Sequence, residues 1–374
     1  MSRIKLKDIA VEKNERVDNP SDSPYSIFVG LEHYDSGEAT IRRFGSTEML
    51  ESTMKVFHAG DILVARRNVY LRRAASVDFD GLTSGDSIVL HIENESYRHI
   101  VPFVLNTDNF WNYANQHADG SMSKRLSPKL LMEYEFSIPE KNIENITEIL
   151  WAMERTKNAY RELIKKTDDL VKSQFVEMFG DPASNPKGYP VKKLSDLGEL
   201  NRGVSKARPR NNPALLGGPY PLVQTGEVTA AELYIKRFES TYSEAGLAQS
   251  RMWPKGTLCI TIAANIAQTG ILAFDACFPD SVVGFISQGD VTQIYMHYWF
   301  SFFQKILEQQ ATQVAQKNIN LKVLSELDVM VPPMESQKQF VSFIEQTDKS
   351  KLAAKQALDD LTAAQRALMR QYLG

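Results

Sequence analysis

The stretch ITEILWAMERTKNAYRELIKKTDDLVKSQFVEMFG, residues 146–180, decides the fold, because the chain contains its pattern twice. Its seam residues recur in alternating steps of four and three, as in a heptad repeat. Residues 340–374, FVSFIEQTDKSKLAAKQALDDLTAAQRALMRQYLG, carry the same steps 194 residues later without a gap. Each copy has a lysine at the same step, Lys157 in the first and Lys351 in the second. A duplicated unit with matched heptads predicts a pseudo-two-fold molecule held by an antiparallel pair of helices.

The predicted seam is mostly apolar, and its polar members Lys157, Thr167 and Gln174 are expected to fix the register of the pair. The alternative is that each helix is an ordinary amphipathic helix packed on its own domain. A helix of roughly 38 residues would run near 57 Å at about 1.5 Å per residue, which is more than a domain core of this size needs. The residues expected at the helix-pair or partner interface are Ile146, Leu150, Met153, Tyr160, Ile164, Val171, Phe340, Ile344, Leu358, Leu361 and Leu368.

Short apolar runs also repeat in the rest of the two halves. Residues 60–64 match residues 256–260, and residues 86–89 match residues 280–283. Each run is rich in β-branched residues and bounded by Gly, Pro or Asp, which is typical of strands. Between the runs the sequences differ, so the framework repeats while the loops vary. The chain is therefore predicted to be an α+β protein, with two similar mixed α/β domains and two long antiparallel helices.

Helix-breaking residues mark the limits of the predicted domains. Residues 180–188, GDPASNPKG, read as a linker. Prolines at positions 139 and 333 stand where each long helix is expected to begin. The expected segments are a first domain over residues 1–140, a first long helix over 141–180, a second domain over 181–332 and a second long helix over 333–374.

The bulk composition of the 374 residues narrows the class of protein. The net charge is −3, so contacts with nucleic acid would have to come from local basic clusters. The two cysteines, Cys259 and Cys277, form no CxxC pair, which argues against a disulfide framework or a structural zinc site and fits a reducing cytosol. No signal peptide opens the chain, and its most apolar stretch, residues 257–278, is interrupted by polar residues. A cytoplasmic protein is the expectation.

Three motifs resemble the specificity (S) subunits of type I restriction-modification systems. LVKSQFVEMFGDP at 170–182 is similar to the end of their central conserved region. The NINLKVL, VPP and ESQ segments within residues 318–337 resemble the beginning of their distal conserved region, and YPLVQTGE at 220–227 resembles part of a target recognition domain. The similarity covers the second half almost wholly and the first long helix. Residues 1–140 match less well and depend mainly on the internal repeat.

The resemblance implies two target recognition domains that each read one half of a split sequence in double-stranded DNA, with two long helices that set the gap. It also implies two modification subunits that dock on the helices and methylate adenine, and restriction subunits that can join to cut DNA. S-adenosylmethionine, ATP and magnesium are then expected on the partner subunits only. The S subunit itself would have no catalytic residue, cofactor or metal.

The residues themselves agree with a non-catalytic role. An adenine methyltransferase needs an Asn/Asp-Pro-Pro-Tyr/Phe motif for the flipped base, but Pro332-Pro333 lies between Val331 and Met334. No GxxxxGK[ST] phosphate loop occurs, which argues against a translocase. The six histidines are scattered without metal-ligand spacing.

The second half offers one loop suited to DNA, NRGVSKARPR at residues 201–210, with phosphate contact and arginine readout of guanine as its predicted roles. The alternative is an ordinary solvated loop. Residues 224–226, QTG, follow a predicted strand, and a glutamine can bind adenine through two hydrogen bonds, although turn structure explains them equally. Residues 316–318, QKN, close a predicted helix and are expected either to reach DNA or to cap that helix.

In the first half the favoured basic pairs follow a predicted strand at 62–64 and a loop at 120–123, and the second pair corresponds to residues 316–318. The doublets Arg42-Arg43 and Arg72-Arg73 are interpreted as solvated faces. The complete set of DNA-contact candidates is Arg66, Arg67, Lys124, Arg125, Arg202, Lys206, Arg208, Arg210, Gln224, Thr225, Gly226, Gln316, Lys317 and Asn318.

Two other functions remain open on the sequence alone. A protein-interaction scaffold with duplicated domains and no DNA readout is favoured mildly by the lack of overall positive charge and disfavoured by the composition of the loops. An autonomous nuclease or methyltransferase would need a catalytic motif that the sequence lacks.

Overall fold

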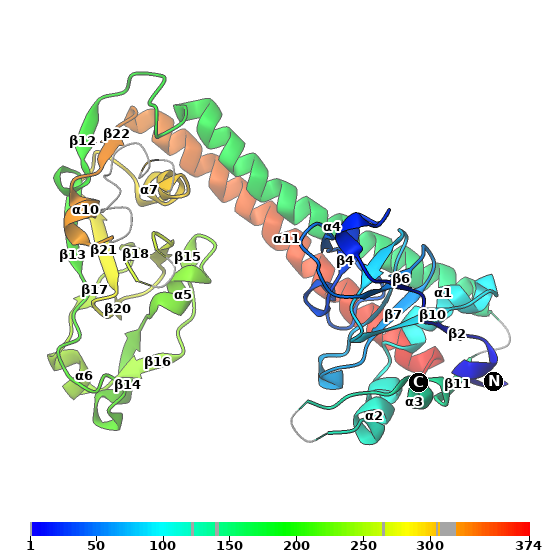
Figure 1. Ribbon diagram of the computed structural model, residues 1–374. Coiled ribbons are helices and arrows are strands. Elements are labelled where there is room, and N and C mark those ends of the chain that lie inside the picture. Colours follow the sequence, from blue (N-terminus) through cyan, green and yellow to red (C-terminus); the bar gives the residue numbers. More distant parts are fainter. Residues whose placement is uncertain (1, 121–122, 139–141, 264–265, 304–305, 307–318) are drawn as a thin grey trace. The chain divides into compact units, whose positions relative to one another are not determined.

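The computed structural model describes residues 2–120, 123–138, 142–263, 266–303, 306 and 319–374 (Figure 1). Its contacts divide the chain into two compact units. Unit 1 comprises Met1–Leu163 together with Ala354–Gly374, and unit 2 comprises Ile164–Ala353. The two long helices are therefore shared between the units, whereas the sequence places them in segments of their own.

The two predicted long helices are present as α4 (Ile143–Phe179) and α11 (Met334–Tyr372). In unit 1, Ile146 and Leu150 of α4 join one core with Met369 and Leu373 of α11. In unit 2, Phe175 of α4 packs on Phe340 of α11. The α4 residue number rises from unit 1 to unit 2 while the α11 number falls, so the helices are antiparallel. This confirms the predicted pairing.

Burial along both helices follows the predicted seam. Every one of its positions, from Ile146 to Met178 and from Phe340 to Tyr372, is buried or half-buried. The apolar residues beside the seam, Ile149, Leu163 and Leu170, are about half exposed. The sheets also pack against the seam side, so each helix serves the helix pair and its own unit at once.

The described residues of unit 1 form three sheets and three shorter α-helices. A four-stranded sheet has the order β2-β10-β7-β8, and a five-stranded sheet has the order β3-β6-β9-β4-β5. Strands β1 and β11 form a separate antiparallel pair. The strands are β1 (Ser2–Lys5), β2 (Val11–Lys13), β3 (Arg16–Val17), β4 (Ile27–Val29), β5 (Gly45–Ser46), β6 (Met54–Phe57), β7 (Ile62–Ala65), β8 (Ala74–Ser76), β9 (Gly81–Thr83), β10 (Ser87–His91) and β11 (Glu135–Ile138). The helices are α1 (Glu95–Val104), α2 (Asp108–His117) and α3 (Pro128–Met132).

Unit 2 repeats this plan. A five-stranded sheet has the order β13-β21-β18-β19-β15, a four-stranded sheet has the order β16-β14-β20-β17, and β12 pairs with β22. The strands are β12 (Val191–Lys193), β13 (Gly198–Arg202), β14 (Leu216–Leu222), β15 (Tyr234–Ile235), β16 (Ser240–Tyr242), β17 (Met252–Trp253), β18 (Leu258–Thr261), β19 (Thr269–Leu272), β20 (Ala276–Cys277), β21 (Val282–Ser287) and β22 (Asp328–Met330). The helices are α5 (Thr225–Thr229), α6 (Glu244–Ala248), α7 (Gln293–Phe300) and α10 (Leu321–Ser325).

The repeated runs of the sequence become equivalent strands. Antiparallel β10-β7-β8 of unit 1 corresponds to antiparallel β21-β18-β19 of unit 2. The second sheets correspond too, because β4 runs parallel to β9 just as β14 runs parallel to β20. In both units a strand from the start pairs with the strand that precedes a long helix. The two units therefore share the same strand pairings, as the internal repeat of the sequence predicts.

The cores explain why the long helices hold in place. In unit 2, Phe175 is fully buried among the rings of Phe179, Tyr295, Phe302 and Phe340, with centroids 5.1–5.5 Å apart. Aromatic pairs at such distances add to the free energy gained from burying apolar area. The aromatic side chains of α7, of the residues just after α7 and of both long helices therefore belong to one continuous core in unit 2.

Replacing Phe175 by alanine tests this core. We expect Phe175→Ala to lower the free energy of local opening in the second half of α4 by about 3–5 kcal/mol, because a buried ring leaves a cavity. Val176→Ala, at an exposed neighbouring position, is the control and should cost less than about 0.5 kcal/mol. Amide hydrogen exchange along α4 measures both values, and equal protection in the two variants would contradict the packing described.

Candidate nucleic-acid interface

Three predicted DNA-contact arginines of unit 2 meet at one aspartate, Asp280. Arg202, the last residue of β13, donates its Nε hydrogen to the main-chain oxygen of Asp280 at 2.8 Å. The guanidinium group of Arg208 lies 3.6 Å from one carboxylate oxygen of Asp280, and Arg210 donates to the other oxygen. All three arginines are exposed. Unit 2 therefore presents three guanidinium groups around one negative charge.

Unit 1 has a corresponding cluster at Asp86. The two carboxylate oxygens of Asp86 accept hydrogen bonds from Arg67 at 3.2 Å and from Arg125 at 3.1 Å. A β-bridge between the main chains of Arg67 and Arg125 holds the two arginines side by side. Both side chains are nearly half exposed. The structure thus joins two basic pairs that the sequence gave no reason to place together.

Strand pairing explains why the clusters form at these places. Asp86 directly precedes β10, whose first residue pairs with Ala65, the last residue of β7. Arg67 follows Ala65 by two residues and therefore lies near Asp86. In unit 2, Val283 near the start of β21 pairs with Arg202 at the end of β13. In antiparallel pairs the end of one strand lies beside the start of the other. An acidic residue before one strand therefore meets arginines that follow its neighbour.

The other basic candidates differ in exposure. Lys206 is exposed beside the cluster of unit 2. Lys124 is half-buried and donates to the main-chain oxygen of Asn115 at 2.7 Å, so its ammonium group holds α2 in place. Arg66 is half-buried, and its Nε has no hydrogen-bond partner among the described residues. Exposure favours Arg67, Arg125 and the unit 2 arginines over Lys124 and Arg66.

The segment at residues 224–226 forms the beginning of a short helix. The main-chain nitrogen of Gln224 donates to Glu227 at 3.1 Å, while Thr225 and Gly226 lie in the first turn of α5. The Gln224 side chain is exposed. The structural alternative for this motif is turn structure; the segment begins a short helix instead and leaves the glutamine side chain accessible. Gln316, Lys317 and Asn318 lie outside the described residues.

Three arginines of the doublets interpreted as solvated faces bind other parts of unit 1 instead, Arg42 and Arg72 through ion pairs and Arg73 through hydrogen bonds to main-chain oxygens. Arg42 bonds to Asp35 at 3.1 Å and to Asn158 of α4 at 2.9 Å. Arg72 binds Asp108 at 2.6 Å, and Arg73 donates to the main-chain oxygen of Leu31 at 3.0 Å. The sequence interpretation is wrong for these three residues, because each one holds two segments of unit 1 together.

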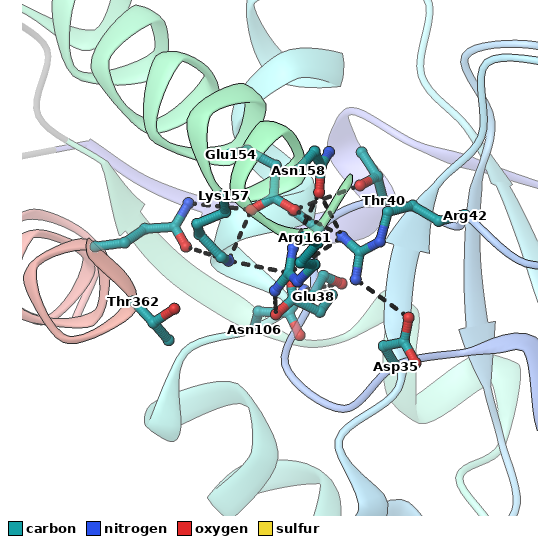
Figure 2. Close-up of polar contacts among 12 residues, drawn as sticks. Asp35, Glu38, Thr40, Arg42, Asn106, Glu154, Lys157, Asn158, Arg161 and Thr362 are labelled. Atoms are coloured by element: carbon teal, nitrogen blue, oxygen red, sulfur yellow. Dashed lines mark hydrogen bonds and ion pairs between the residues drawn. The ribbon is translucent and has the colours of Figure 1, made fainter. Parts of the chain in front are cut away.

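Arg42 is part of a group of polar side chains that surrounds a buried lysine, Lys157, on the seam of α4 (Figure 2). Lys157 and Glu154 are each only 1% exposed and lie 2.9 Å apart. The ammonium group also binds Glu38 at 3.0 Å and Gln365 of α11 at 2.8 Å. Three parts of unit 1, namely α4, α11 and the loop at residue 38, therefore meet at one charge.

Unit 2 has the equivalent arrangement around Lys351 of α11. Its ammonium group binds Asp168 of α4 at 2.6 Å and Glu232, in the loop before β15, at 3.2 Å. The same step of 194 residues that relates Lys157 to Lys351 relates Glu38 to Glu232. We call these two arrangements the lysine clasps. The sequence reasoning noted both lysines and missed both glutamates, although the repeat of the step was a signal that could have found them.

The oppositely charged groups of the clasps shift the pKa values of Glu38 and Lys351. Burial alone would raise the pKa of Glu38, but the charges of Lys157, Arg161 and Arg42 outweigh burial and hold that pKa below its ordinary value. Burial would lower the pKa of Lys351, but its bonds to Asp168 and Glu232 raise it. Both shifts favour the charged forms, so the clasps are ion pairs at neutral pH.

Two further observations bear on ligands. Within the described ranges, no group of three or more His, Cys, Asp or Glu side chains is arranged to hold a metal ion. Of the helices that the structure describes, none combines the length and the apolar character needed to cross a membrane.

Comparisons with known proteins agree with this architecture. Residues 186–362 match the family model of the type I restriction modification DNA specificity domain. A chain from a solved structure on the complex assembly and conformational transition of the type I restriction-modification system has a TM-score of 0.58 and 17% identity, covering 99% of this chain and 96% of that one. The type I restriction-modification S subunit from M. genitalium has a TM-score of 0.56 and 11% identity, covering 100% and 96%. At these identities the two structures show a shared fold.

The chain thus consists of two duplicated α/β units, each with an arginine cluster at one sheet edge, and unit 2 carries most of the match to the DNA specificity domain. The family match covers residues 186–362, slightly less than half of the 374 residues, and the two solved structures extend the similarity in fold to the whole chain. The alternative of a scaffold without DNA readout is not favoured.

The clasp of unit 1 makes a testable contribution to stability. We expect Glu38→Gln to lower the stability of unit 1 at pH 7 by about 1–3 kcal/mol, the range for hydrogen bonds to charged groups. Because the folded pKa of Glu38 is lowered, its contribution is complete above the ordinary glutamate pKa of about 4.3 and disappears as pH falls through the lowered value. The difference between wild type and variant should shrink in acid. Hydrogen exchange of the first half of α4 between pH 7 and pH 3 measures it, with the exposed Glu148→Gln as control. A difference that is independent of pH would contradict the ion pair.

Proposed function

We propose that the protein recognises a split sequence in double-stranded DNA, one half with each unit, and directs adenine methylation by two modification subunits. The observation that carries this proposal is the pair of arginine clusters at equivalent sheet edges, around Asp86 and Asp280. Two similar sites in one chain suit two half-sites on one duplex, because each site can read its own bases. The repeated framework with different loops supports two different half-sequences.

Arginine is the residue type that best serves this purpose. Its planar guanidinium group binds the O6 and N7 atoms of guanine through two hydrogen bonds, and the same group binds phosphate. Arg67, Arg125, Arg208 and Arg210 supply such groups on exposed surface. The overall charge of −3 is compatible with DNA binding because the positive groups are concentrated at the clusters.

The long helices suit the role of a spacer. They contain 37 and 39 residues without interruption, so at about 1.5 Å per residue each one spans more than 50 Å. Their seams are buried over the whole predicted length, which fixes how far one helix can slide along the other. Both helices continue from one unit into the other. We therefore propose that helix length sets the gap between the two half-sites.

The partners that we propose are modification subunits that dock on the long helices, and restriction subunits that join the complex to cut DNA. The apolar side chains of Ile149, Leu163 and Leu170, about half exposed at heptad-related positions of α4, support a docking face. Methyl transfer with S-adenosylmethionine and ATP-dependent cleavage with magnesium would then take place on these partners, while this chain remains non-catalytic. We also propose a cytoplasmic location, because such a complex acts on the DNA of the cell.

Removing two arginines tests DNA readout. We expect the double variant Arg208→Ala, Arg210→Ala to abolish methylation at the target, because each arginine that reads a base contributes about 1–3 kcal/mol. Association with the modification subunits should be unchanged, since neither residue lies on a long helix. Lys192→Ala removes a positive charge elsewhere in unit 2 and is the control. Genome-wide mapping of methylated adenine measures the outcome, and methylation that persists at the same sites would favour the scaffold.

Shortening both helices by one heptad tests the spacer. Deletion of residues 161–167 and 352–358 keeps the seam in phase and removes about 10.5 Å of helix, which corresponds to about three base pairs at 3.4 Å each. We expect methylated sites whose gap is shorter by about that number, with both half-sequences unchanged. Methylation of a library with every gap length measures this, and an unchanged gap would refute the spacer role.

A further inference from the structure

The two carboxylates at the centres of the arginine clusters are equivalent residues of the repeat, while their arginine partners are not. Asp86 and Asp280 are 194 residues apart; Asp86 directly precedes β10, and Asp280 lies two residues before the matching strand β21. The step that matches residues 60–64 to 256–260 relates Arg67 to Ala263, and the pair Lys124-Arg125 corresponds to residues 316–318, which contain no arginine. The arginines of unit 2 come instead from β13 and the loop that follows it. The aspartate at the centre of each cluster is thus at a matching position of the repeat, while the arginines that bind it come from different positions in the two units.

The placement of the carboxylates is also the same in both units. The side chain of Asp86 is 27% exposed, whereas its two arginines are 46% and 45% exposed. The side chain of Asp280 is 35% exposed, against 56% and 46% for Arg208 and Arg210. Each aspartate side chain is therefore less exposed than the arginine side chains that it binds. A ligand as large as DNA has more arginine surface than acid surface available to it.

On the basis of the proposed function, we propose that Asp86 and Asp280 set the specificity of their units by restraining two arginines each against binding to non-target DNA. A carboxylate beside two guanidinium groups cancels half of their charge, and non-specific binding depends almost wholly on charge. Base readout also depends on hydrogen-bond geometry, and a bound guanidinium group keeps donors on its other edge. The acid therefore weakens phosphate binding more than it weakens readout of the correct base.

The strength of these ion pairs suits such a restraint. Exposed pairs between arginine and carboxylate are individually weak and screened by salt. A phosphate or a base edge in the correct place can therefore replace part of the interaction. A deeply buried pair, such as Lys157 with Glu154, could not respond in this way because breaking it would leave a charge without a partner.

Substitution of the two aspartates by asparagine tests the proposal. We expect Asp86→Asn and Asp280→Asn each to raise the affinity for a duplex without the target sequence by about three- to tenfold, and to steepen the dependence on salt by about one unit of logarithmic slope. In the complex with the modification subunits, methylation should spread from the target to sites with one changed base. The measurement is a titration of the full-length protein with a non-target duplex at several salt concentrations, together with methylation mapping.

Matched variants separate this effect from a general change in charge or folding. Asp290→Asn and Glu133→Gln remove a carboxylate from other exposed ion pairs of unit 2 and unit 1, and they should leave non-target affinity within twofold of wild type. Asp86→Glu and Asp280→Glu keep the negative charge, so they should bind non-target DNA as weakly as the wild-type protein does. In the double variant Asp280→Asn, Arg210→Met, the loss of one arginine should return non-target affinity toward the wild-type value.

Several outcomes would overturn the proposal. Unchanged non-target affinity in both asparagine variants would do so while leaving DNA recognition by the arginines intact. Weaker binding of the target with no gain on non-target DNA would instead make the aspartates positioning residues for the arginines. A wild-type protein that fails to bind any duplex, alone or with its modification subunits, would overturn the proposed function as well.

Discussion

A buried lysine constrains each unit of this protein, Lys157 in unit 1 and Lys351 in unit 2. Burying an ammonium ion costs several kcal/mol unless carboxylates and hydrogen-bond acceptors surround it. Lys157 obtains these groups from α4, α11 and a loop of unit 1, and Lys351 obtains carboxylates from α4 and a loop of unit 2. A slip of one heptad would replace Gln365 by Leu358 or Tyr372 and leave Lys157 without that acceptor. The clasps therefore select a single register for the pair, as a polar residue does in other helix seams.

The sequence predicted the parts of the fold that repeat. Heptad spacing identified both long helices and their buried side, and β-branched runs identified β7, β10, β18 and β21. These predictions succeed because periodicity and strand propensity are local properties. Short strands such as β3, β5 and β15 have two residues each, so they leave almost no local signal and form through pairing with neighbours.

The candidate site was predictable in its residue types and not in its grouping. Basic residues that follow strands suggested DNA contact, but nothing local indicated that Arg67 and Arg125, 58 residues apart in the numbering, share one carboxylate. Lys124 next to Arg125 is committed to a main-chain oxygen of α2 instead. Neighbouring residues in a loop thus take opposite roles according to the tertiary contacts, which the sequence does not encode locally.

The composition of unit 1 has a consequence for the order in which the protein becomes structured during synthesis. Unit 2 is a continuous segment, Ile164–Ala353, whereas unit 1 needs Ala354–Gly374 to complete its core. Oε1 of Gln365 accepts a hydrogen bond from the ammonium group of Lys157, which lies 208 positions earlier in the chain. Until residues 354–374 leave the ribosome, the first half of α4 carries an ammonium group and an apolar seam without their helical partner. The domain made first is therefore the one completed last, and its exposed seam stays accessible to chaperones throughout the synthesis of unit 2.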